Sequence, residues 1–123
     1  MVSRKEVSKI ISDWVNLFNL QSYEIDFITN TEIKNLAEIQ TDYKYKRAVI
    51  YISPKIKRRE LNRAISHELL HILVGEIRAQ LRPLLDRITQ EEADKILFTE
   101  ESVVEQLSRV FCSLVEFDPK EVK

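Results

Sequence analysis

Apolar residues recur at helical spacing near the start of the chain and at strand spacing in the segments that follow. Ser3 and Glu6 spell a capping box, which predicts a helix beginning there. Alternating apolar and polar residues predict strands at 23–27, 37–43 and 47–52, with the hairpin turn between the last two at Lys44, Tyr45 and Lys46. The apolar face of the first helix is expected to comprise Val7, Ile10, Ile11, Trp14, Leu17 and Phe18.

The segment 60–73 is apolar around most of its circumference and predicts a largely buried helix. Gly75, the only glycine, is expected to close this helix in a left-handed conformation, and Pro83 is expected to prevent one unbroken helix beyond it. A second capping box at residues 89–92 predicts a short helix over 90–97. A separate final helix is expected to start at Thr99 as N-cap and to stop before Asp118 and Pro119.

This order of elements predicts an α+β fold in one domain spanning residues 1–123. It comprises an N-terminal helix, a three-stranded antiparallel or mixed sheet, a central helix and a C-terminal helical part. Because the strands are grouped and not alternated with helices, the pattern argues against a parallel βαβ sheet.

Both histidines of the chain lie in the string His67-Glu68-Leu69-Leu70-His71. On a helix, residues four apart share one face, so the two imidazoles can bind one metal ion. Glu68 then faces the open side of the metal, where its carboxylate can take a proton from zinc-bound water. The spacing therefore indicates a catalytic Zn²⁺ site. The alternatives are a chance match and a helix whose histidines only form hydrogen bonds within the fold.

A catalytic zinc needs a third protein ligand, and no further histidine exists. An extended motif would place glycine and histidine at positions that Val74 and Ile77 occupy, so it is excluded. The remaining candidates are carboxylates and Cys112, which is more typical of a small core residue. Because catalytic zinc commonly takes two histidines and one glutamate, the acidic helical segment 99–111 is the expected source.

At these residues the chain resembles the gluzincins, zinc peptidases in which a second helix brings a glutamate to the metal. The similarity is greatest to the small minigluzincins and related phage or mobile-element peptidases. It implies a zincin-like fold, Glu101 as third ligand, and Glu105 as the residue that orients a zinc-bound histidine. It also implies that an edge strand before the motif helix pairs with the substrate backbone. By resemblance that strand is formed by Val49, Ile50, Tyr51 and Ile52.

Two alternatives to these assignments stay open on the sequence. Periodicity alone favours Glu100, which projects nearer the centre of the helix's apolar stripe than Glu101. Carboxylates also favour the first turn of any helix, without a role in metal binding. For the strand, the side chains at 49–52 are expected to lie in the core, and pairing of its backbone with substrate is a separate expectation.

The expected function is that of a zinc-dependent metallopeptidase, with an endopeptidase favoured over an exopeptidase and a peptide or protein as substrate. Glu68 would act as general base toward a zinc-activated water and later protonate the leaving amine. The tyrosine or histidine that larger gluzincins use for the oxyanion is missing after Tyr51, which leaves Arg87, Lys95, Arg109 or the metal alone. The alternative is a catalytically silent zinc-binding or pseudo-peptidase module that binds a protein segment.

Charge and composition narrow the other classes. A net charge of −1 gives no general attraction to nucleic acid or to an anionic membrane. A third interpretation, a nucleic-acid-associated regulator with a structural metal, would rest on a local basic cluster that lacks interleaved aromatic residues. With a lone cysteine and no signal-peptide or transmembrane pattern, we expect a cytoplasmic protein with no membrane partner. The basic cluster comprises Lys55, Lys57, Arg58, Arg59 and Arg63.

Overall fold

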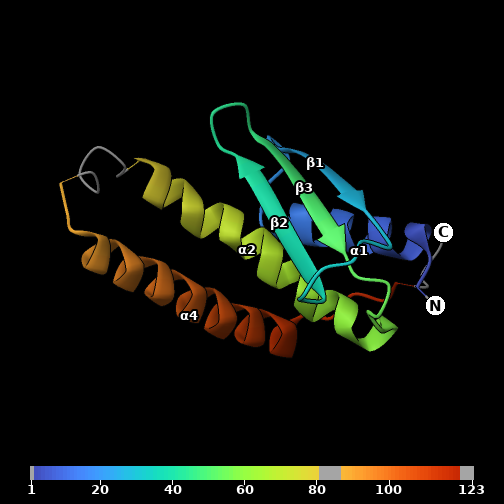
Figure 1. The fold of residues 1–123 in the computed structure, drawn as a ribbon. Helices are drawn as coiled ribbons and strands as arrows, with labels where there is room; N and C mark the ends of the chain where they lie inside the picture. Colours follow the sequence, from blue (N-terminus) through green and yellow to red (C-terminus); the bar gives the residue numbers. More distant parts are fainter. Residues whose placement is uncertain (1, 81–86, 120–123) are drawn as a thin grey trace.

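The computed structural model describes residues 2–80 and 87–119 and has an α+β architecture, as expected (Figure 1). Helix α1 spans Arg4–Leu17 and is followed by strands β1 (Glu24–Ile28), β2 (Ala37–Asp42) and β3 (Arg47–Ile52). A 3-10 turn, η1 (Arg58–Glu60), leads into helix α2 (Leu61–Gln80), and helix α4 covers Gln90–Leu114. The capping boxes at Ser3 and Thr89 form as predicted.

The sheet is mixed, with strand order β1-β3-β2. Strands β2 and β3 form the expected antiparallel hairpin, in which Ala37 pairs with Ile52 and Asp42 with Arg47. Strand β1 pairs in parallel with β3, and the intervening strand β2 takes the far edge. Because β3 is the central strand, its backbone is hydrogen-bonded to a neighbouring strand on both sides. Strand β2 is an edge strand and is paired on one side only.

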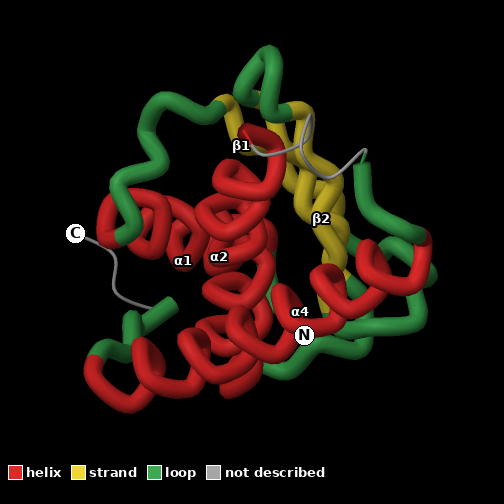
Figure 2. Tube along the Cα trace, turned by 90° about the vertical axis from the view of Figure 1, so that its left-hand side faces the viewer, coloured by secondary structure: helices red, strands yellow, loops and turns green. Residues whose placement is uncertain are grey.

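Helix α2 lies between the sheet and α4, and α1 packs beside it under the sheet (Figures 1 and 2). The inward faces of α1, α2 and the sheet form a continuous apolar core, where each fully buried large side chain contributes roughly 1.5–3 kcal/mol. None of the helices in the described ranges is long and apolar enough to cross a bilayer. Fully buried core residues include Ile10, Trp14, Ile50, Ile52, Leu61, Ile65, Leu69 and Ile72.

The expected end of α2 at Gly75 is wrong, because the helix continues to Gln80 and no glycine has a positive φ. The glycine serves packing instead. A Cβ at this position would overlap the phenol oxygen of Tyr43, which lies against the helix. Pro83, the other residue expected to interrupt this helix, lies outside the described residues.

The two helices expected at 90–97 and from Thr99 onward are one continuous helix, α4. Thr99 is therefore not an N-cap, and its hydroxyl donates to the carbonyl of Lys95 at 2.9 Å within the helix. No glycine or proline stands between the two predicted segments, so nothing in the backbone interrupts the helix. The helix ends at Leu114, four residues before the Asp118-Pro119 pair that was expected to stop it.

Asn62 joins the start of α2 to α1 and to the segment after α4. Its side-chain oxygen accepts from Trp14 Nε1 at 2.8 Å and from the backbone N–H of Phe117 at 3.1 Å. Its amide nitrogen donates to the Phe117 carbonyl at 2.8 Å. The Trp14 and Phe117 rings also pack edge to face, with centroids 5.1 Å apart. Asn62 thus fixes the C-terminal segment on the core.

We expect Asn62→Leu to destabilise the fold by about 2–4 kcal/mol, because it leaves the buried Trp14 N–H and the Phe117 backbone without partners. Urea unfolding followed by tryptophan fluorescence measures this change. Gln106→Leu replaces an exposed amide on α4 and is expected to change the free energy of unfolding by less than about 0.5 kcal/mol. Equal effects of the two substitutions would contradict the role assigned to Asn62.

Candidate metal centre

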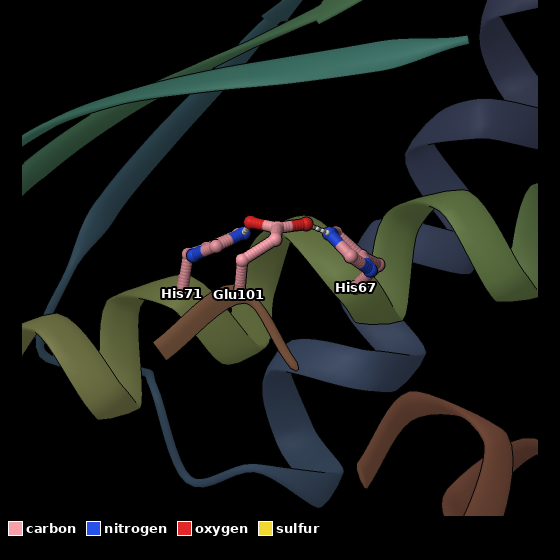
Figure 3. A group of neighbouring side chains, drawn as sticks. All are labelled: His67, His71 and Glu101. Atoms are coloured by element: carbon pink, nitrogen blue, oxygen red, sulfur yellow. Dashed lines mark ion pairs between the residues drawn. The ribbon is translucent and has the colours of Figure 1, made fainter. Parts of the chain in front are cut away.

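Helices α2 and α4 bring His67, His71 and Glu101 together (Figure 3). The two histidines stand one turn apart on α2, with ring centroids separated by 5.0 Å. Glu101 reaches between them from α4. One carboxylate oxygen lies 2.8 Å from His67 Nε2 and the other lies 2.9 Å from His71 Nε2. Two imidazoles and one carboxylate therefore converge from two helices.

A second carboxylate stands behind each histidine. Glu105 Oε2 lies 2.9 Å from His67 Nδ1, the ring nitrogen that does not face Glu101. Glu100 Oε1 lies 3.5 Å from His71 Nδ1. The side chain of Glu100 is only 9% exposed and that of Glu101 is 57% exposed. The helical periodicity was therefore right that Glu100 is the more buried residue, but Glu101 is the one that faces both Nε2 atoms.

Arginines hold these outer carboxylates in place. Arg63 and Arg109 both bond Glu105, the latter at 3.2 Å, and Arg78 Nε bonds Glu100 at 2.7 Å. Burial acts to raise the pKa of Glu105, but the hydrogen bonds from the two arginines outweigh it and hold that pKa below its usual value. Glu105 is thus kept as an anion next to His67 Nδ1, where it can orient the imidazole ring.

Small residues allow α2 and α4 to approach closely beside this site. Ser66 and Ser108 are fully buried, and their hydroxyl oxygens lie 3.0 Å apart. Cys112 lies one turn further along α4, with its sulfur 3.4 Å from the Ser66 hydroxyl. The cysteine therefore belongs to this helix contact and not to the group formed by His67, His71 and Glu101.

Glu68 lines a cleft of about 1090 Å³ together with the two histidines and Glu101. Burial, with Glu101 and Glu38 nearby, raises the pKa of Glu68 to about 8. Among the described residues its carboxylate has no hydrogen-bond partner, so it is available to a molecule in the cleft. A cation bound beside it would lower this pKa and favour the anion.

The strand that lines the cleft opposite helix α2 is β2, and not the segment 49–52 that was expected to bind the substrate backbone. Residues 35–39, 41 and 43, from β2 and its flanks, line the cleft, and no residue of β3 does. Val49, Ile50, Tyr51 and Ile52 belong to the central strand, which β1 and β2 cover on either side. The strand next to the motif in sequence is therefore not the edge strand, because the hairpin turns β2 outward to the cleft.

The expected cationic substitutes for an oxyanion-stabilising group do not line the cleft. Arg109 bonds Glu105, Lys95 pairs with Glu91 at 3.8 Å, and Arg87 is also absent from the lining. The lining instead includes Tyr43, Arg59 and Arg78. The sequence around the motif does not indicate Tyr43, because the β2–β3 hairpin brings this earlier tyrosine back to the motif helix.

The donor set fits a divalent metal. One donor atom from each of His67, His71 and Glu101 lies within 4.8 Å of the other two, and both histidines have Nδ1 facing a carboxylate. Two imidazoles and one carboxylate form a ligand set known for catalytic zinc, and the outer carboxylates fix the ring orientation.

No protein-family model matches the chain, and no curated protein matches it either.

Proposed function

We propose that this protein is a zinc-dependent peptidase with a zincin-like fold. The observation that supports it most strongly is the convergence of His67 Nε2, His71 Nε2 and the Glu101 carboxylate beside a cleft. Glu68, the motif residue next to His67, lines the same cleft. A purely structural metal site is usually closed by four protein ligands, whereas three leave a position for water or substrate.

In this proposal His67, His71 and Glu101 hold Zn²⁺, while Glu105 and Glu100 orient the two imidazoles. The metal would supply Lewis acidity and lower the pKa of a coordinated water toward 7. Glu68 takes the proton of the attacking water and returns it to the leaving amine. A bound cation would also lower the pKa of Glu68 from its raised metal-free value, which keeps the carboxylate ionised and able to accept that proton.

The substrate is proposed to be a peptide that binds in extended form beside β2. An edge strand offers backbone N–H and C=O groups to an added strand. Arg59 and Asn35 line the cleft toward the start of α2, and Tyr43 and Arg78 line it toward the end of that helix. Since the histidines stand between these two ends, peptide can extend to both sides of the metal, which favours an endopeptidase over an exopeptidase.

The alternative is a pseudo-peptidase module that binds a protein segment without cutting it. The cleft lining supports binding equally in both cases, and the two differ in chemistry alone. The nucleic-acid interpretation has less support, because two arginines of the basic cluster already pair with glutamates of this chain. Arg58 bonds Glu6 at the start of α1, and Arg63 bonds Glu105.

We expect the purified protein, loaded with one equivalent of Zn²⁺, to cleave members of a peptide library internally. Removing the metal with a chelator should reduce cleavage to background, and adding zinc should restore it. Mass spectrometry of the products measures both cleavage and its position. Peptide retention without products would instead identify the binding module, and salt-sensitive retention of DNA or RNA would favour the third interpretation.

A further inference from the structure

Tyr43, at the first position after β2, lies against the turn of α2 that carries His71. Its hydroxyl donates to the His71 backbone carbonyl at 3.1 Å. The side chain also lines the cleft. Tyr43 therefore connects the end of edge strand β2 to the turn of α2 that carries His71.

The only glycine of the chain stands opposite this phenol. Gly75 lies one turn after His71, in the interior of α2, where glycine is less favourable than alanine. Neither a turn nor a positive φ requires a glycine there. A Cβ at this position would overlap both the Oη and the Cζ atom of Tyr43. The close approach of the phenol is therefore the feature that requires glycine at 75.

We propose that Tyr43 is a positioning residue, which fixes the His71 turn of α2 against edge strand β2 and so sets the place of the second metal ligand. Gly75 provides the room for it. This inference rests on the proposed metal site. The hydroxyl binds a backbone carbonyl and not the imidazole, so it acts on the position of the whole turn.

The hairpin has a second, independent attachment to α2. Lys46 Nζ lies 3.5 Å from Glu76, and the Tyr23 hydroxyl also bonds Glu76. Lys46, in the turn between β2 and β3, attaches the hairpin to the helix when Tyr43 is replaced, and Tyr23 attaches the start of β1, which pairs with β3. A substitution at Tyr43 is therefore expected to change the His71 turn without detaching β2, which makes the proposal testable in a folded protein.

The test is a double-mutant cycle of Tyr43→Ala and Gly75→Ala, read by Co²⁺ titration and by thermal unfolding of the metal-free protein. Each single substitution is expected to weaken Co²⁺ affinity about tenfold. Gly75→Ala should lower the melting temperature of the wild-type protein through overlap with the phenol. In the Tyr43→Ala background it should raise it by about 3–5 °C, because alanine favours the helix.

Two further variants complete the experiment. Tyr43→Phe keeps the ring and removes only the hydroxyl, and it is expected to weaken Co²⁺ affinity about threefold. Tyr45→Ala removes a 65%-exposed tyrosine from the same turn and should leave affinity unchanged. Equal Co²⁺ affinity in all variants, or the same temperature shift for Gly75→Ala in both backgrounds, would overturn the positioning role. No Co²⁺ binding by the wild-type protein would overturn the metal site itself and this proposal with it.

Discussion

Glu68→Gln is expected to reduce peptide cleavage by about two to four orders of magnitude while zinc stays bound. Glutamine keeps the size of the side chain but cannot accept the proton of the attacking water. The group formed by His67, His71 and Glu101 does not include this residue, so metal content should remain at one equivalent. Cleavage rates with a fluorogenic peptide, together with zinc content by mass spectrometry, measure the two effects separately.

The fold is expected to tolerate this change. Burial already favours the protonated form of Glu68, so a neutral amide of the same size matches the form that the metal-free cleft favours. Glu91→Gln is a matched control, since it makes the same chemical change at an 84%-exposed position near the start of α4. It should retain full cleavage. Unchanged cleavage by the Glu68 variant would refute the assigned proton transfer. Loss of zinc from this variant would contradict the predicted metal retention.

The second large effect concerns the two adjacent glutamates of α4. Glu100→Gln removes a carboxylate that lies 3.5 Å from His71 Nδ1, and we expect it to weaken zinc affinity by roughly 10–100-fold. Glu101→Gln removes the carboxylate that faces both Nε2 atoms, and it is expected to weaken affinity by more than that range. Competition with a chromophoric zinc chelator measures both dissociation constants.

The order of the two effects is the decisive result. The paired variants differ by one position on the same helix and make the same chemical change, so general effects on helix charge are closely matched. A larger loss for Glu100→Gln would assign the third ligand to Glu100 and would contradict the geometry around Glu101. Glu105→Gln removes the carboxylate next to His67 Nδ1, and we expect it to weaken zinc affinity about as much as Glu100→Gln does.

The parts of the site that depend on local spacing could be predicted from the sequence. Residues four apart on a helix share a face, so His67 and His71 had to lie together once the segment was helical. The choice between Glu100 and Glu101 was harder, because it depends on how α4 is rotated against α2. Buried Ser66 and Ser108 set that rotation, and their contact joins residues 42 positions apart.

Two of the features that sequence patterns did not predict depend on non-local contacts, the strand order and the role of Gly75. The order β1-β3-β2 follows from how the strands pair, and alternation within each strand carries no information about its neighbours. The family resemblance places the edge strand at residues 49–52, whereas the observed pairing makes β3 the central strand and β2 an edge strand. Local rules likewise predict a helix end at Gly75, whereas its role comes from the contact with Tyr43, 32 positions earlier by their numbers.

Anomalous diffraction at the zinc edge, from crystals of the zinc-loaded protein, tests the central claim most directly. We predict a strong peak about 2.0–2.2 Å from His67 Nε2, from His71 Nε2 and from a carboxylate oxygen of Glu101, with Glu68 facing the remaining position. The absence of a peak between the two imidazoles, or a peak that the Glu101 carboxylate does not reach, would contradict it.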